Sequence, residues 1–334
     1  MRLRAFAAAV VATLLAGLAA CSSGPQASPS ASSAAPSESA SAPSAFPATI
    51  ATKFGDVTVK AKPTRVVALG WGDAETVLAL GVQPVGASDW LGFGGEGVGP
   101  WARGLYTTAP EIIGTMEPSY EKIGALKPDL ILDVKSSGDQ ARYDRLKSIA
   151  PTIGVPTGGD SYLTSPETQL TMIATALGEK EKAAALQKEV ADAFAAAAAA
   201  HPEWKGKTMT AATKSANSWG AYIEGSERVT FMQNLGFVQN PKIAAMKPDA
   251  TGFSVSLSSE KLDDIDADVV VAFPIFIKTE QLTGDAAWKA VPAVEAGHAV
   301  VIDGDLSQAY SLGTTMATKY AIENLVPKLE AALK

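Results

Sequence analysis

The chain has 334 residues, with 28 Lys and Arg against 35 Asp and Glu, a pI near 5.0 and one cysteine. The chain therefore lacks the basic excess expected of a nucleic-acid-binding protein, which excludes that class. A single cysteine also excludes a framework of disulfide bonds within the chain.

The N-terminal segment has the pattern of a secretory signal. Arg2 and Arg4 precede an alanine-rich apolar stretch that ends at Cys21. The stretch is shorter than the about 20 residues that a membrane-spanning helix needs. Residues 18–21 resemble the bacterial lipobox, in which the cysteine receives a diacylglyceryl group. We therefore expect residues 1–21 to be a lipoprotein signal peptide; the alternative is an ordinary signal peptide that contains a cysteine.

Residues 22–48 consist almost entirely of Ser, Ala and Pro. They show no hydrophobic periodicity, and they have too little bulky apolar surface to offset the entropy of ordering. We expect this segment to be a disordered tether between the lipid anchor and the folded body.

Residues 49–165 alternate between short apolar runs and helical patterns, which predicts a parallel sheet covered by helices. Gly81 follows the first helical pattern, as a C-terminal glycine should. The predicted strands are 65–69, 82–88, 129–134 and 151–155, and the predicted helices are 74–80, 121–127 and 143–149.

Residues 206–334 repeat these patterns in the same order. The segment from Ser119 to Ile123 is echoed by Ser258 to Leu262, and each is followed at the same interval by Asp and an apolar run. This repeat predicts two homologous lobes, 49–165 and 206–334.

Residues 166–205 carry apolar side chains at helical spacing on both sides of Gly178. Six consecutive alanines precede His201 and Pro202, and alanine has the highest helix propensity. The predicted fold is therefore α/β, with two homologous lobes that have parallel-sheet cores and are joined by one long helix.

Taken together, these patterns resemble the helical-backbone (class III) binding proteins of ABC importers, in particular the iron-siderophore branch. The resemblance covers almost all of residues 52–334 and rests on the order and spacing of several short segments. These are 63–69, 78–86, 121–132 with 150–152, 260–271 and 288–303. It implies a monomeric, non-enzymatic protein that is anchored outside the membrane through Cys21 and passes its ligand to a permease.

Glu121 and Glu260 stand in the third position of two matching Ser-x-Glu segments. A carboxylate in the first turn of a helix complements the helix dipole, which is a purely structural explanation. The resemblance implies a functional one: the matching glutamates of the family, one in each lobe, pair with arginines of the permease subunits. Ser119 and Ser258 are predicted to cap the two helices.

The ligand is expected in a cleft lined by loops at the carboxyl ends of the parallel strands. For each aromatic residue there, a place in a domain core is the alternative. Trp71 is flanked by two glycines, which favours an exposed loop. The expected ligand-binding residues are Trp71, Trp90, Lys135, Trp219, Tyr222, Arg228, Phe273, Phe276 and Tyr310.

Aromatic faces with few cations suit a ferric siderophore, whose iron is already fully coordinated. The protein then needs no metal ligands or cofactor of its own. Only Lys135 and Arg228 are placed at the cleft, with Arg103 and Arg142 as further candidates. Two cations are too few for a ferric tris-catecholate, so we expect a hydroxamate-type chelate. A haem or cobalamin receptor of the same fold is the alternative.

Other functional classes find little support in the sequence. His201 and His298 are the only histidines, and they are not clustered as zinc or manganese ligands would be. The glycines of 92–97 fit the spacing of a dinucleotide fingerprint, but Pro100 follows where a helix should begin. No hydrolase, metalloprotease or NTPase motif occurs. A nitrogenase-like enzyme and an adhesive surface protein are the remaining alternatives.

Overall fold

The computed structural model describes residues 45–334, which begin with an antiparallel hairpin. Strand β1 (Ala48–Thr52) pairs with β2 (Gly55–Val59). Alternate residues of β1 are buried, as expected for a strand with one face on a core. The expected signal peptide, the lipidation of Cys21 and all but the last residues of the expected tether lie outside the described residues.

The first sheet has five parallel strands in the order β5-β4-β3-β6-β7. This confirms the predicted parallel α/β core of the first half. We call the part formed by the hairpin, this sheet and its helices the first lobe. Its sheet strands are β3 (Val66–Ala68), β4 (Gly86–Ser88), β5 (Glu111–Ile113), β6 (Leu130–Leu132) and β7 (Thr152–Ile153). Its helices are α1 (Asp73–Ala79), η1 (Pro100–Ala102), α2 (Tyr120–Ala125) and α3 (Gln140–Lys147).

The sheet of the second lobe is mixed, which corrects the expectation of a parallel core in both halves. Strands β10, β12 and β13 are parallel to their neighbours, whereas β9 is antiparallel to both β8 and β11. The turn 215–218 joins β8 directly to β9, and a turn that short connects only antiparallel strands. The strands are β8 (Thr208–Lys214), β9 (Trp219–Tyr222), β10 (Val238–Gln239), β11 (Ser254–Leu257), β12 (Val269–Pro274) and β13 (Ala299–Val301).

The two lobes nevertheless share one strand order, β4-β3-β6-β7 in the first and β10-β8-β12-β13 in the second. They also share a hydrogen-bonding arrangement beside the sheet, in which an aspartate accepts two hydrogen bonds from one threonine. Asp129 accepts from the backbone N and Oγ1 of Thr64 at 2.8 and 2.7 Å. Asp268 accepts from the same atoms of Thr208 at 2.6 and 2.7 Å, and these hydrogen bonds lower the pKa of Asp268. The repeat in the sequence therefore corresponds to a repeat in the structure.

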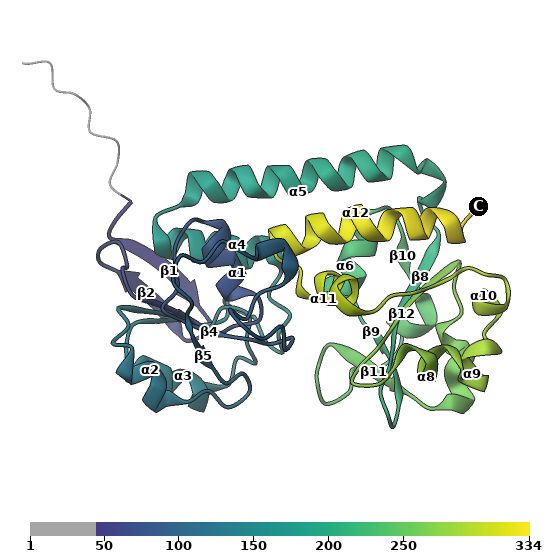
Figure 1. Ribbon diagram of the computed structural model, residues 1–334, viewed down its shortest axis with the longest axis horizontal. Helices are drawn as coiled ribbons and strands as arrows, with labels where there is room; N and C mark the ends of the chain where they lie inside the picture. The colour runs from purple at the N-terminus through teal and green to yellow at the C-terminus, as the bar shows by residue number, and fades with distance from the viewer. Residues whose placement is uncertain (1–44) are drawn as a thin grey trace, which may run out of the picture. The chain divides into compact units, whose positions relative to one another are not determined.

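Helices α4 (Pro166–Leu177) and α5 (Lys180–Ala200) connect the lobes, as the sequence predicted. Ser165 caps α4 by accepting a hydrogen bond from the backbone N of Thr168. Gly178, at φ 73°, ends α4 in the left-handed conformation that favours glycine. Figure 1 shows α5 running from the first lobe to the second. The short helix η2 (Pro202–Trp204) follows it.

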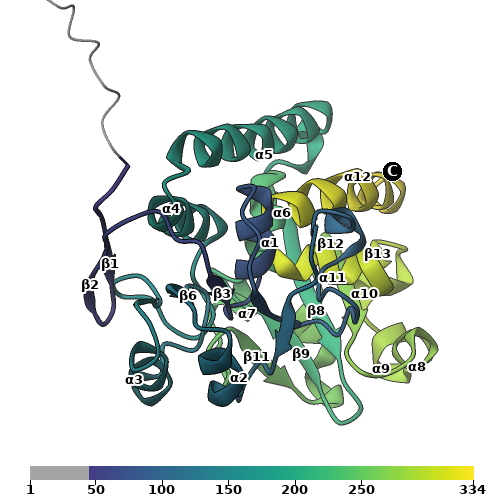
Figure 2. The same cartoon turned by 60° about the vertical axis from the view of Figure 1, so that its left-hand side comes forward.

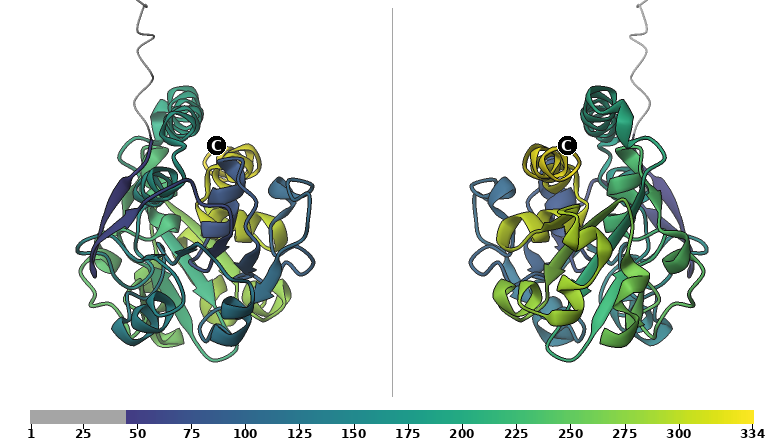
Figure 3. Two further views of the ribbon diagram at one scale, coloured as in Figure 1. Left: turned by 90° about the vertical axis from the view of Figure 1, so that its left-hand side faces the viewer. Right: turned by 90° about the vertical axis from the view of Figure 1, so that its right-hand side faces the viewer.

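The C-terminal helix α12 (Thr315–Ala332) lies beside α5, as the end-on views of Figure 3 show. Lys319 of α12 pairs with Glu189 of α5 at 2.9 Å. Figure 2 shows α1 of the first lobe next to α12 and α11.

Within residues 45–334, none of the helices combines the length and hydropathy that a membrane span needs. The other helices of the second lobe are α6 (Glu227–Asn234), α7 (Pro241–Ala244), η3 (Ser259–Ile265), α8 (Thr279–Thr283), α9 (Ala286–Lys289), α10 (Pro292–Glu295) and α11 (Gly304–Leu312).

Candidate ligand site between the lobes

The first lobe presents Trp71 in the loop that follows β3. The Trp71 backbone N donates to the carbonyl of Lys135, in the loop after β6, at 2.8 Å. Gly72, at φ 77°, then starts α1 in a conformation that favours glycine. The Trp71 side chain is partly exposed, as its flanking glycines led us to expect.

Asp73 holds these two loops together. Its buried carboxylate accepts from the backbone N of Gly70 at 3.1 Å and of Val134 at 2.8 Å, and from Gln169 of α4 at 2.6 Å. Burial raises the pKa of Asp73 to about 6. The loop that carries Trp71 is therefore fixed against both the sheet and the first connecting helix.

Six aromatic side chains from both lobes form a continuous group, which we call the interlobe aromatic group. Ring centroids are separated by 5.8 Å for Trp71 and Trp90, 5.4 Å for Trp90 and Tyr162, and 6.5 Å for Tyr162 and Phe253. In the second lobe the stacked pairs Phe253–Tyr222 and Tyr222–Phe273 continue the group at 6.2 and 5.7 Å. Its members are Trp71, Trp90, Tyr162, Tyr222, Phe253 and Phe273; sequence analysis missed Tyr162 and Phe253.

Arg228 of α6 lies among these rings. Its guanidinium carbon is 4.3 Å from the ring centroid of Tyr222, 5.7 Å from that of Trp71 and 6.0 Å from that of Phe273. Nε donates to Ser311 at 3.2 Å, while Nη1 and Nη2 have no hydrogen-bond partner among residues 45–334. Because no carboxylate within that range forms a salt bridge with Arg228, the guanidinium is free to donate to an oxygen-rich ligand.

Lys135 has a different environment from the one expected. Its Nζ donates to Glu227 across the lobes, and the side chains are 3% and 7% exposed. Burial raises the pKa of the Glu227 carboxyl, and the charge of Lys135 opposes that rise. This ion pair offsets the charge of Lys135, which leaves Arg228 as the cation of the two without a salt bridge, although its charge also lowers the pKa of Glu227.

Of three further predicted residues, Trp219 and Phe276 lie outside the aromatic group, whereas Tyr310 borders it, edge-on to Phe273 with ring centroids 6.5 Å apart. Trp219 was expected at the cleft, but it is 2% exposed and stacks on Trp288 in the core of the second lobe. Successive strand residues point to opposite faces, so Trp219 and Tyr222 of β9 face different cores. Tyr310 is buried, and its hydroxyl donates to the Arg228 carbonyl at 2.7 Å, which positions α6. Phe276 is fully exposed in a turn after β12.

Arg142 also proves to be a structural residue. It is 8% exposed and forms a bidentate salt bridge with Asp133, in which Nε donates at 3.0 Å and Nη2 at 2.7 Å. Its Nη1 donates to the carbonyl of Thr115 at 2.9 Å. Its charge is therefore compensated within the first lobe, whereas Arg103 is exposed and has no salt bridge among residues 45–334.

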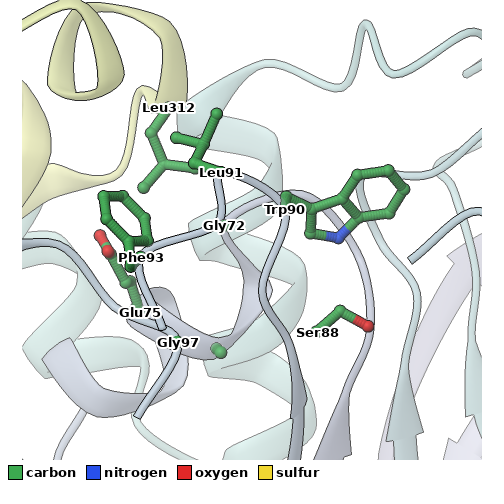
Figure 4. A pocket seen from close by; sticks show the side chains of 9 residues that line it. Gly72, Glu75, Ser88, Trp90, Leu91, Phe93, Gly97 and Leu312 are labelled. Atoms are coloured by element: carbon green, nitrogen blue, oxygen red, sulfur yellow. The ribbon is translucent and has the colours of Figure 1, made fainter. Parts of the chain in front are cut away.

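The glycine-rich loop 92–97 borders a pocket of about 10 Å³, which is room for one water molecule. Figure 4 shows Glu75 and Phe93 in this pocket, with Leu312 of the second lobe beside Leu91. The buried Glu75 accepts from Trp101 and from Thr314 of the second lobe, both at 2.7 Å, and burial raises its pKa. An internal carboxylate beside the loop disfavours phosphate binding there.

Glu121 and Glu260 are both exposed, one in each lobe. Ser119 caps α2 by accepting from the backbone N of Lys122 at 3.3 Å, as predicted. Ser258 precedes the 3-10 helix η3, and its side chain makes no capping hydrogen bond, which corrects the prediction for that residue.

Among residues 45–334 there is no group of three or more His, Cys, Asp or Glu side chains that could hold a metal ion. His201 stacks on Trp204, with ring centroids 3.9 Å apart.

Residues 66–306 match the sequence profile of a family described as periplasmic binding protein. The probable siderophore-binding lipoprotein YfiY of Bacillus subtilis is 29% identical over 275 residues, which are 73% of this chain and 76% of YfiY. A periplasmic solute binding protein of Mycobacterium smegmatis superposes with a TM-score of 0.73 at 26% identity, over 86% of this chain and 99% of that one. PiaA of Streptococcus pneumoniae in complex with ferrichrome has a TM-score of 0.70 at 25% identity, over 85% and 98%.

Proposed function

Since the chain belongs to the periplasmic binding protein family, we propose that it captures a ferric siderophore of the hydroxamate type between its lobes and delivers it to an ABC permease. In this proposal the protein is not an enzyme and needs no cofactor: it acts by binding alone, as a monomer. It is held on the outer face of the membrane through lipidated Cys21. Relatives named as siderophore-binding and as lipoproteins support this assignment.

The observation that carries the proposal is the setting of Arg228. A guanidinium with free Nη groups lies against aromatic rings contributed by both lobes. Aromatic faces suit the organic shell of a chelate, and the guanidinium suits its oxygens.

The ion pair between Lys135 and Glu227 limits the negative charge that a ligand of this site can carry, because the charge of Lys135 is already offset. A ferric tris-catecholate carries a strong negative charge, and its burial would be costly without several cationic partners. One guanidinium without a salt bridge, whose charge is already partly offset by Glu227, fits a neutral or weakly charged chelate better. This supports the hydroxamate class.

The test is quenching of intrinsic tryptophan fluorescence by ferrichrome, a ferric tris-catecholate, ferric citrate, haem and cobalamin. Trp71 and Trp90 belong to the interlobe aromatic group, so a bound chelate should quench them. We expect submicromolar binding of ferrichrome, at least about tenfold tighter than the catecholate, or about 1.4 kcal/mol. Free tryptophan titrated with each chelate controls for absorption. Equal or tighter catecholate binding would contradict the hydroxamate assignment, and binding of haem or cobalamin alone would favour the alternative receptor class.

Docking to the permease is proposed to use Glu121 and Glu260. Glu121→Ala together with Glu260→Ala should abolish cellular uptake of the chelate and leave its affinity in solution within about threefold, because both side chains are exposed and neither hydrogen-bonds or pairs with the aromatic group. Glu181→Ala with Glu295→Ala removes two other exposed glutamates and serves as the control. A collapse of ligand affinity in the first double variant would place these glutamates in the binding site or the fold.

A further inference from the structure

The loop 156–164, between β7 and α4, holds an unusual backbone conformation. Ser161 and Tyr162 have φ angles of 50° and 61°, in the left-handed region of backbone conformation. Residues other than glycine adopt this region at a cost in free energy. The loop after β6 holds them there: the backbone N of Ser161 donates to the Ser137 carbonyl at 3.3 Å, and that of Tyr162 to the Ser136 carbonyl at 3.0 Å. The fold thus maintains a strained conformation that directs one aromatic side chain.

The Tyr162 ring lies between the lobes. It makes edge contacts with Trp90 of the first lobe and with Phe253 of the second, at interplanar angles of 70° and 87°. Tyr162 and Phe253 are partly exposed, whereas Tyr222 and Phe273 are buried. The pair therefore belongs, with Trp71 and Trp90, to the solvent-accessible part of the interlobe aromatic group.

A glycine of the second lobe makes this contact possible. Gly252, at φ 81°, faces Ser161, and a Cβ on Gly252 would lie only 2.6 Å from Ser161 Oγ. The two loops therefore approach one another more closely than a larger residue would allow. This contact between the lobes is separate from the Lys135–Glu227 ion pair and from the Thr314–Glu75 hydrogen bond.

The Tyr162 hydroxyl has partners within the first lobe, the side chain of Ser137 and the thioether of Met116. It lies 3.4 Å from the sulfur of Met116, and a thioether is a poor hydrogen-bond acceptor. Met116 itself is 66% exposed. A carbonyl or hydroxamate oxygen would be a stronger acceptor for this hydroxyl than the sulfur is.

We propose that Tyr162 is a ligand-contact residue that controls release of the chelate. In this proposal the chelate enters between Tyr162 and Phe253, and the Tyr162 ring then lies on the chelate. This inference rests on the proposed function, since it requires a ligand in the interlobe aromatic group. Tyr162 then affects the rate at which the chelate dissociates. Mutation can separate this role from the contribution of Arg228 to affinity.

The experiment is stopped-flow measurement of association and dissociation of the chelate that the wild type binds best. Tyr162→Ala should raise the dissociation rate about tenfold, since an aromatic contact beyond simple burial is worth up to about that factor. Tyr162→Phe keeps the ring and loses only the hydroxyl's hydrogen bond, so it should raise the dissociation rate less than Tyr162→Ala does. Phe253→Ala removes the partner across the lobes and should mainly raise the association rate, because the site no longer has to open.

Tyr120→Ala is the matched control, because Tyr120 is a partly buried tyrosine of the first lobe outside the aromatic group. Dissociation rates of Tyr162→Ala within twofold of the wild type would overturn the inference and leave the proposed function standing. An equal change in Tyr120→Ala would overturn it as well, by showing a general loosening of the lobe. A wild type that binds no chelate in the panel would overturn both proposals. If Tyr162→Ala unfolds at a lower temperature than the wild type, the dissociation rate of Tyr162→Leu is measured instead and judged by the same criteria.

Discussion

Replacement of Glu227 by glutamine should lower the free energy of unfolding by about 3–5 kcal/mol, the usual cost of breaking a buried ion pair from one side. Glu227 and its partner Lys135 are both buried. Without the carboxylate, the lysine either stays charged in a buried site or loses its proton, and both outcomes cost free energy. Chemical denaturation monitored by circular dichroism measures the difference.

The double variant Lys135→Met with Glu227→Leu should recover most of the lost stability, because apolar side chains of similar size often replace a buried pair at little cost. Asp192→Asn is the control for an exposed pair. Lys188 and Asp192 are 74% and 65% exposed, so its loss should change the free energy of unfolding by at most about 0.5 kcal/mol. A loss below about 1 kcal/mol in Glu227→Gln would mean that the pair is solvated and does not tie the lobes together.

The parts of the fold that could be predicted from sequence are those with a local periodic signal. The connecting helices were predicted because apolar spacing, Gly178 and the alanine run all agree. Four strands of the first sheet were predicted because they are short apolar runs in the buried sheet, whereas β5, which is only partly buried, was missed. The β1–β2 hairpin and the antiparallel β9 were missed, since pairing direction depends on the connection and not on the strand itself.

The site was predicted less completely, for reasons that differ between residues. Trp71, Tyr222 and Arg228 lie together as the strand-end rule suggested. Trp219 does not, although alternation along β9 would have separated it from Tyr222. Glu227 is 92 positions from Lys135, and no local pattern reveals such a partner. Tyr162 and Phe253 come from loops, where periodicity gives no information.

Arg228→Gln should weaken binding of the preferred ferric chelate by about 10- to 100-fold. A hydrogen bond to a charged group contributes about 1.5–3 kcal/mol, and about 1.4 kcal/mol corresponds to a factor of ten. The glutamine keeps a polar side chain but loses the planar cation that lies against Tyr222. Arg228→Lys keeps the charge without the planar guanidinium, so its affinity should fall between the other two. Fluorescence titration under the conditions of the ligand panel gives the three dissociation constants.

The control is Lys214→Gln. Lys214 also lies over a tryptophan of the second lobe, 4.6 Å from the Trp219 ring centroid, but this pair packs with the core on the other face of the sheet. Its replacement should therefore leave chelate affinity unchanged while it weakens the salt bridge to Asp285, which measures 2.7 Å. If Lys214→Gln and Arg228→Gln lose affinity equally, the losses reflect damage to the lobe. If Arg228→Gln binds within threefold of the wild type, the chelate does not touch this guanidinium and the ligand site must lie elsewhere between the lobes.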